Sequence, residues 1–376
     1  MVGSLELRNR NIANITIVRD AGTGATTGFR FVRKDKSPVT TLGVDMVDGA
    51  TEFDISSNRL TAIPVELIQA MIKVKRIVLS KNPIDSFEPR TFYRLPELQE
   101  IVMEKSLLGD FPTEFIQECP KLKRVQINSS YVHTIPSRSI ANLPSLEVFD
   151  LSRNNVTNIT DDSFYNLPTI HTLDLSYNNL TGVPTGVFKL SPGWRVLDFR
   201  RNNISAAPSG LKEAVVTGWV TPISLLTLTY HRSFERNIWV EIHEEEFANA
   251  SQINELNVRS MGIFTVNSRA FRGMTSLKKL DLGDNVISVL APDAFEGLPS
   301  LEVLSLKENN LRQVTFNSLP PKLKHLGLES NQIDEMPQLG EGVNASSIRL
   351  LNMSHNWLWK VETGSELLRY DNLIEL

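Results

Sequence analysis

Three segments of the chain contain residue types that could do chemistry. Residues 21–28 (AGTGATTG) are glycine-rich like phosphate-binding loops, but they lack both the GxGxxG spacing and a following Lys-Ser/Thr. His243 precedes three glutamates, yet no second histidine lies at metal-binding spacing. The single cysteine, Cys119, lies at a position where the repeating pattern of the sequence predicts a buried apolar residue. We therefore expect a loop, a solvated acidic turn and a core thiol, with no catalytic, cofactor or metal site and no enzyme in this segment.

The composition restricts the class of protein and of partner. The 376 residues are 41% hydrophobic and 22% charged, as in a soluble globular protein. A net charge of −4 offers no basic surface for nucleic acid. The longest apolar stretch, residues 214–230, is interrupted by Gly218 and Pro222, so membrane insertion by this segment is not expected. One cysteine excludes an internal disulfide framework, and no signal-peptide pattern follows Met1.

The elements that must position any site come from an internal repeat. Asn154-Asn155, Asn178-Asn179 and Asn202-Asn203 recur at a constant interval, each after an L-x-L-type pair. Taking the first Asn as the reference position gives fifteen candidate repeats, with degenerate ones at Arg10, Lys34 and Asn237. The reference positions are Arg10, Lys34, Asn58, Asn82, Ser106, Ser130, Asn154, Asn178, Asn202, Asn237, Met261, Asn285, Asn309, Asn331 and Asn356.

The fullest repeat, residues 277–298 (LKKLDLGDNVISVLAPDAFEGL), reads L-x-x-L-x-L-x-x-N-x-L-x-x-L/P-x-x-x-x-F-x-x-L. This pattern resembles the leucine-rich-repeat family, in its 24-residue variant common in extracellular proteins. The resemblance covers essentially the whole chain. It implies an α/β horseshoe solenoid with a concave parallel β-sheet, an irregular or short-helical convex side, and a role in binding other macromolecules.

Elementary physical chemistry leads to the same fold. The L-x-L alternation predicts a short half-buried strand, and strands that cannot bury one face alone stack in parallel about 4.8 Å apart. The amide of each reference Asn can bond backbone groups left free where the chain turns, which predicts a ladder of asparagines. Phenylalanines recur ten positions later and should fill the convex side of the core. They are Phe92, Phe164, Phe188, Phe271 and Phe295.

We expect a single solenoid over residues 1–376, degenerate at 1–50 and interrupted by an irregular insertion at about 203–237. Within that insertion, residues 226–228 could form the tenth strand and leave 231–236 as an extra loop. Both ends look truncated, because the chain opens inside a repeat strand at Leu5 and closes where a sixteenth strand would begin. Near the end, Trp357 and Trp359 should pack under a further repeat.

Partners are expected on the outward positions of the concave sheet, where solenoids bind proteins or peptides. Arginine and tyrosine are enriched at interface hot spots, which favours binding there. The aspartates can equally be repeat consensus, with arginines that only neutralise them. The candidate residues are Arg124, Asp150, Arg153, Asp174, Tyr177, Asp198, Arg200 and Arg201.

Nine N-x-S/T sequons, about twice the number that chance predicts, favour an extracellular or cell-surface location. The missing cysteine caps speak against it. Glycans on Asn155, Asn179 and Asn203 would line one edge of the solenoid. The sequon asparagines are Asn14, Asn128, Asn155, Asn158, Asn179, Asn203, Asn249, Asn344 and Asn352.

The leading functional hypothesis is the protein-recognition ectodomain of a cell-surface receptor or adhesion protein involved in signal transduction, as the resemblance implies. One alternative is an intracellular scaffold or regulatory subunit. A third is the sensor region of a larger kinase. A signal peptide with a membrane span, the lack of both, or a kinase motif set in the full gene would distinguish the three.

Overall fold

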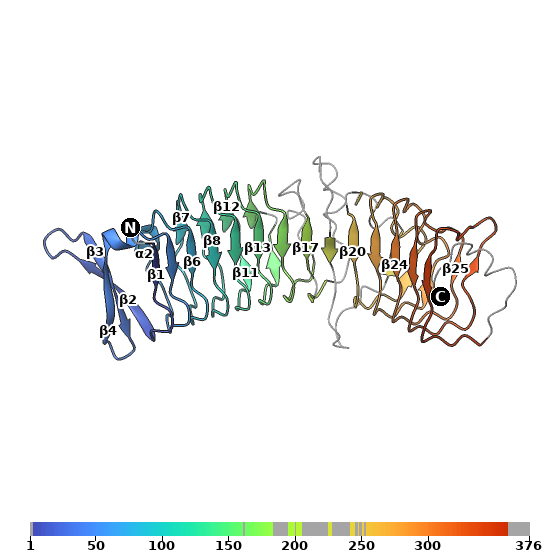
Figure 1. Cartoon of the computed structure of the whole chain (residues 1–376), viewed down its shortest axis with the longest axis horizontal. Helices are drawn as coiled ribbons and strands as arrows, with labels where there is room; N and C mark the ends of the chain where they lie inside the picture. The colour runs from blue at the N-terminus through green and yellow to red at the C-terminus, as the bar shows by residue number, and fades with distance from the viewer. Residues whose placement is uncertain are drawn as a thin grey trace. The chain divides into compact units, whose positions relative to one another are not determined.

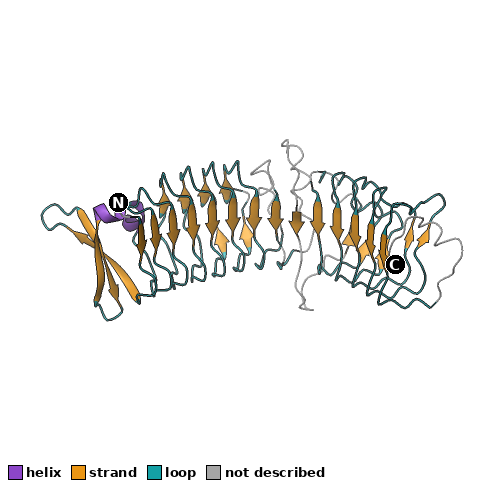
Figure 2. Cartoon of the chain, in the orientation of Figure 1, coloured by secondary structure: helices purple, strands orange, loops and turns teal. Residues whose placement is uncertain are grey.

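The structure of the chain, a computed structural model, consists of two compact units, residues 1–179 and 180–376. It describes residues 3–160, 162–182, 195–199, 201–204, 225–227 (backbone only), 241–244, 247, 250–251 and 253–359. Each unit is a stack of repeats that contribute short parallel strands, with little helix (Figures 1 and 2).

Seven three-residue strands form the parallel sheet of the first unit. The spacing between neighbours is constant from β5 onwards, so that Asp150 lies opposite Asp174 and Val125 opposite Phe149. The middle residue of each strand is inward and buried, as the alternation predicts. The strands, in order across the sheet, are β1 (Ser4–Glu6), β5 (Glu52–Asp54), β6 (Arg76–Val78), β8 (Glu100–Val102), β10 (Arg124–Gln126), β13 (Val148–Asp150) and β16 (Thr172–Asp174).

Seven further strands form the parallel sheet of the second unit. They are β17 (Val196–Asp198), β18 (Leu225–Thr227), β20 (Glu255–Asn257), β22 (Lys279–Asp281), β24 (Val303–Ser305), β26 (His325–Gly327) and β28 (Leu350–Asn352). The strand expected at 226–228 is therefore present, one position earlier. Its pairing corrects the reference position Asn237: Val196 lies opposite Leu225 and Leu226 opposite Leu256, so the extra length is shared between two turns. The expected loop at 231–236 lies outside the described residues.

The predicted second repeat, centred on Lys34, is wrong. Residues 12–43 form a three-stranded antiparallel sheet of β2 (Ile12–Arg19), β3 (Thr26–Arg33) and β4 (Pro38–Gly43), placed beside β1 at the N-terminal end (Figure 1). Alternating apolar residues such as Phe29 and Phe31 are fully buried on one face of this sheet. The match of Lys34 to the repeat spacing is therefore accidental, because the period-two pattern decides the local structure.

The opposite side of each unit is built from turns and two-residue strands rather than helices. In the first unit these strands are β7 (Phe92–Tyr93), β9 (Ile116–Gln117), β11 (Thr134–Ile135), β12 (Ile140–Ala141), β14 (Asn158–Ile159) and β15 (Phe164–Tyr165). In the second they are β19 (Glu241–Ile242), β21 (Thr265–Val266), β23 (Val289–Leu290), β25 (Thr315–Phe316) and β27 (Gln338–Leu339). The helices among the described residues are α1 (Val44–Asp48) and α2 (Val65–Gln69).

The predicted phenylalanine column is confirmed at four of its five positions. Phe92, Phe164, Phe271 and Phe295 are at most 2% exposed, while Phe188 lies outside the described residues. In the second unit the rings of Phe271 and Phe295 stack with centroids 6.0 Å apart. Equivalent aromatic side chains of successive turns therefore continue one core from turn to turn.

The asparagine ladder is also confirmed. Nδ2 of Asn178 donates to the carbonyl oxygens of Leu151 and Leu175, both at 3.0 Å, and its Oδ1 accepts from the backbone N–H of Val156 at 2.9 Å. Each asparagine thus joins its own turn to the preceding one. At Ser106 and Ser130, where the sequence lacks Asn, the two hydroxyls bond each other at 2.7 Å.

Candidate binding surface

The aspartates of the sheet face have a structural task. Oδ1 of Asp150 accepts from the backbone N–H of Ser152 at 2.8 Å, and Asp174 does the same with Ser176 at 2.9 Å. The second oxygen of Asp150 accepts from Nδ2 of Asn128 at 2.8 Å. Equivalent bonds occur at Asp54, Asn257, Asp281 and Asn352. The consensus interpretation of the aspartate column therefore holds, because each side chain caps the end of its strand.

Asp198, the third aspartate of the column, is only 7% exposed, so it offers a partner little surface.

Arginine and tyrosine behave differently from the aspartates. The guanidinium carbon of Arg153 lies 4.4 Å from the centroid of the Tyr177 ring, a cation–π contact between successive turns. Arg153 is exposed, and among the described residues its guanidinium has no carboxylate partner. Its guanidinium donors therefore have no carboxylate acceptor in the described chain, and the Tyr177 ring orients the group.

Backbone conformation places these side chains at a fixed point of each turn. Arg153, Tyr177 and Arg201 have φ values of 58°, 56° and 57°, in the left-handed region, directly before the ladder asparagine. Non-glycine residues rarely adopt this region, and here the ladder bonds on either side hold them in it. Arg201 is half-buried, whereas Arg200 lies outside the described residues.

Arg124 ends a column of alternating charges. Arg76 donates to Glu52 at 2.8 Å and to Glu100 at 2.7 Å, so these three residues bridge β5, β6 and β8. Arg124 lies opposite Glu100 in the next strand, but Glu100 is already bound to Arg76. The Arg124 side chain is exposed and has no ion-pair partner among the described residues. We call Arg124, Arg153 and Tyr177, with the half-buried Val148 and Thr172 that continue the row of Arg124 across the next two strands, the sheet-face patch.

Sequence reasoning missed the ion pairs between equivalent positions of neighbouring repeats. Opposite charges one repeat apart join Arg94 to Glu118, Glu97 to Lys121 and Lys123 to Glu147. The signal is present in the sequence, because aligning the repeats places these charges side by side. Such pairs neutralise many charges beside the sheet. Arg124 and Arg153 lack such a partner within the described ranges.

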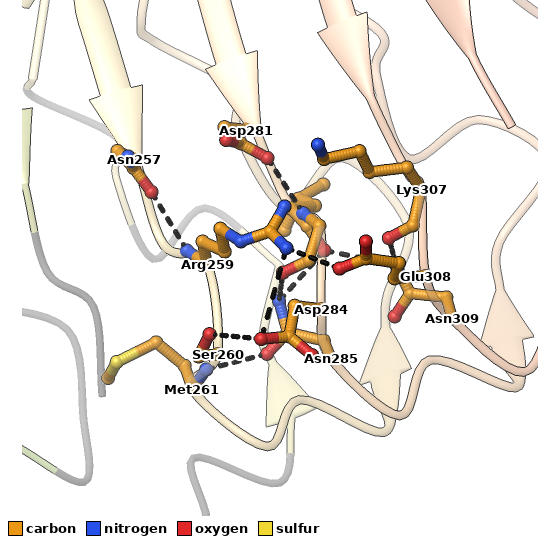
Figure 3. Close-up of polar contacts among 12 residues, drawn as sticks. Asn257, Arg259, Ser260, Met261, Asp281, Asp284, Asn285, Lys307, Glu308 and Asn309 are labelled. Atoms are coloured by element: carbon orange, nitrogen blue, oxygen red, sulfur yellow. Dashed lines mark hydrogen bonds and ion pairs between the residues drawn. The ribbon is translucent and has the colours of Figure 1, made fainter. Parts of the chain in front are cut away.

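In the second unit an arginine one repeat position before that of Arg153 lies among acidic residues of the following turns (Figure 3). Arg259 reaches across one whole turn to bind Glu308, and its guanidinium lies 4.0 Å from Asp284. Ser260 donates to Asp284 at 2.7 Å. Gly283 leaves room for this arginine, since a Cβ there would lie 2.9 Å from Nη1. The Arg259 guanidinium therefore serves the repeat stack rather than a partner.

The segments first considered for chemistry lie in a turn, in the core and at the surface. Residues 21–25 form the turn between β2 and β3, where Asp20 accepts backbone bonds from Gly22 and Thr23. Cys119 is buried, and burial raises the pKa of its thiol to about 12. His243 is exposed and lies 3.5 Å from the Glu241 carboxylate. Across the described ranges no group of acidic, histidine or cysteine side chains is arranged to hold a metal.

The sequons differ in accessibility. Asn14, Asn158, Asn179 and Asn344 are exposed, whereas Asn128, Asn155, Asn203 and Asn352 are half-buried. Asn249 lies outside the described residues. Asn155 and Asn179 follow directly on ladder asparagines, so they lie along one edge of the first unit, as expected.

Three stretches of the chain, residues 49–108, 120–180 and 251–311, match the family model for the leucine rich repeat. The chain is a leucine-rich-repeat protein. No curated protein matches this leucine-rich-repeat chain significantly. Within the described residues, no helix has the length and apolar character needed to cross a membrane.

Solved structures share the fold at low sequence identity. A leucine-rich-repeat protein of Leptospira interrogans is 21% identical, with a TM-score of 0.63 over 89% of this chain and 80% of its own. An internalin of Listeria monocytogenes is 15% identical, with a TM-score of 0.57 over 89% of each chain. Drosophila Toll, in complex with Spatzle, is 21% identical, with a TM-score of 0.60 over 83% of this chain but only 38% of Toll. These likenesses show the solenoid fold.

Proposed function

We propose that this leucine-rich-repeat protein binds a protein or peptide through the sheet-face patch of its first unit. The observation that carries the proposal is the exposed guanidinium of Arg153, which lies over the Tyr177 ring and has no carboxylate partner in the described chain. Arginine and tyrosine supply much of the binding energy at protein interfaces. Arg124, likewise exposed, adds a second cation on the same sheet.

The half-buried Val148 and Thr172 complete the patch, because they continue the row of Arg124 across the next two strands. A partner with carboxylates spaced to meet Arg124 and Arg153 would fit it, since arginine binds carboxylates in a bidentate manner. The similar Toll structure holds a protein partner, Spatzle, which supports protein recognition as the general role.

Replacement of both arginines tests this proposal. The double variant Arg124→Glu, Arg153→Glu and the unchanged chain are each immobilised. Both are then used to capture proteins from the culture medium and from an extract of the source cells. The patch predicts that partners captured by the unchanged chain are depleted at least about tenfold by the double variant. Arg349→Glu is the matched control, because Arg349 is an exposed arginine of the second unit. Equal capture by all three chains, with unchanged unfolding curves, would move the site elsewhere.

We further propose an extracellular or cell-surface setting, as part of a receptor or adhesion glycoprotein. The support is the sequon excess together with the exposure of Asn14, Asn158, Asn179 and Asn344. Intact mass before and after glycosidase treatment of secreted protein tests this setting. A mass unchanged by the glycosidase would remove it and favour an intracellular scaffold.

A further inference from the structure

A polar hollow of about 730 Å³ lies along one edge of the second unit, within the usual size range of small-ligand sites. None of the residues that line it takes part in the sheet-face patch. They are Ser288, Asn310, Arg312, Gln313, Gln332 and Asp334. We call this site the edge hollow.

Three successive turns supply the lining from equivalent positions, one to four residues after the ladder residue. Their backbones are joined side by side: the N–H of Asn310 donates to Ile287 at 3.0 Å, and that of Gln332 donates to Leu311 at 2.9 Å. The polar side chains therefore project from a repeating, hydrogen-bonded frame, which holds their spacing constant.

The edge hollow combines zero net charge with unused hydrogen-bonding capacity. Arg312 and Asp334 cancel in charge, and the other four lining residues are neutral. Nε of Arg312 donates to Oε1 of Gln332 at 3.3 Å. This bond uses the amide oxygen of Gln332, so its NH2 group can donate to a ligand. Oδ1 of Asp334 is buried without a hydrogen-bond partner in the described chain. Asp334 lines the hollow, so its carboxylate supplies acceptor capacity there.

Two exposed tryptophans border the edge hollow in the next turn. Trp357 and Trp359 occupy the positions equivalent to Gln332 and Asp334, and their backbone N–H groups donate to Ile333 at 2.9 Å and to Asp334 at 3.5 Å. Their side chains are 62% and 72% exposed. The expectation that this pair packs beneath a further repeat stays a prediction, because residues 360–376 lie outside the described residues.

The same edge differs between the two units in its sequons. In the first unit the position after the ladder residue carries the sequons Asn155 and Asn179. At the edge hollow this position is Asn310, followed by Leu-Arg, and then Gln332, so neither forms a sequon. Glycans would therefore leave this stretch of the edge open.

We propose that the edge hollow binds a neutral saccharide, with sugar hydroxyls on its amides and carboxylate and a sugar face against the tryptophans. A hydroxyl both donates and accepts, and amide, guanidinium and carboxylate side chains together satisfy both functions. The apolar C–H face of a pyranose suits an indole ring, which buries a large area at small entropic cost. A site without net charge discriminates against sulfated or phosphorylated ligands.

Calorimetry with the full chain tests the proposal against hexasaccharides of β-1,4-linked glucose, N-acetylglucosamine, mannose and xylose, and a sulfated hexasaccharide. At least one neutral hexasaccharide binds, and the sulfated one does not bind more tightly. Trp359→Ala and Gln332→Ala each weaken that binding at least about tenfold. Gln313→Ala, at an exposed position, gives a third variant should either of the others impair folding.

Tyr131→Ala is the matched control, because Tyr131 is a 52% exposed aromatic at the equivalent edge position of the first unit. We expect Tyr131→Ala to leave saccharide binding unchanged. The double variant of Arg124 and Arg153 should also leave it unchanged, so the proposal for each site is tested independently of the other. The proposal is overturned if no neutral hexasaccharide binds, if only the sulfated one binds, or if Tyr131→Ala weakens binding as much as Trp359→Ala.

Discussion

At the scale of single residues, the ladder asparagines stabilise the fold by satisfying buried backbone groups that the sheet and turns leave open. Asn178 bonds the carbonyl oxygens of two turns and one N–H, and it is 5% exposed. Asn179, the next residue, is exposed. Of these two adjacent asparagines, we therefore expect Asn178 to be important for stability and Asn179 to contribute little.

Asn178→Ala should lower the free energy of unfolding by about 2–4 kcal/mol, because it leaves buried carbonyl and N–H groups without partners. Asn179→Ala should change it by less than about 0.5 kcal/mol. Urea unfolding followed by circular dichroism measures both. Equal effects of the two changes would contradict the role assigned to the ladder.

Cys119 provides a test of burial at one atom. Burial raises the pKa of its thiol from an ordinary 9.0 to about 12, so the folded chain favours the neutral thiol. The resulting stabilisation is complete below pH 9 and is lost as the pH rises from about 9 towards 12. At neutral pH the folded protein should react with a disulfide reagent far more slowly than the protein in concentrated guanidinium chloride. Rapid stoichiometric reaction of the folded protein would show that the thiol is accessible.

At the scale of elements, charges in equivalent positions join neighbouring strands. Arg76 lies between Glu52 and Glu100 on three adjacent strands, whereas Arg124, on the following strand, has no ion-pair partner in the described chain. The two arginines share a position in the repeat and differ in their partners. Substituting each in turn therefore distinguishes the contribution of the ion pairs to stability from the proposed role of Arg124 in binding.

Arg76→Gln should cost about 1 kcal/mol of stability, less at high salt, because two half-exposed carboxylates then face each other without a cation. Arg124→Gln should leave stability unchanged. Urea unfolding at low and high sodium chloride measures the difference. A larger loss for Arg124→Gln would indicate that this arginine has a structural partner.

The elements also show where repeat spacing misleads. The constant repeat interval predicted a turn at Lys34, but residues such as Ile15, Phe29 and Phe31 follow the alternation of an ordinary sheet and form β2 and β3. The same alternation predicted the strand that is present at 225–227, although the ladder position Asn237 was misplaced. Strand periodicity therefore outranks repeat spacing wherever the two disagree.

At the scale of the whole molecule, the two proposed sites differ in charge. The chain carries −4, yet the sheet-face patch presents the two cations Arg124 and Arg153. The edge hollow is neutral, because Arg312 and Asp334 cancel. Their ligands should therefore respond differently to salt.

Raising sodium chloride from about 0.05 to 0.5 M should weaken capture of the protein partner severalfold, because the screening length falls. Hexasaccharide binding should change by less than about twofold over that range. Titrations of both ligands across this series measure the contrast. Salt-independent partner binding would argue against the guanidinium groups as its main contacts.

The sequence alone determined the repeat, its strands, its asparagine ladder and its phenylalanine core, because each depends on a residue type recurring at a fixed spacing. It also identified Arg153 and Tyr177 as outward residues. Only the tertiary structure decided that the aspartates cap their own strands, that Arg76 binds two carboxylates, and that Arg153 lies over Tyr177. Those outcomes depend on which side chains meet across neighbouring turns, and the edge hollow likewise exists only where three turns stack.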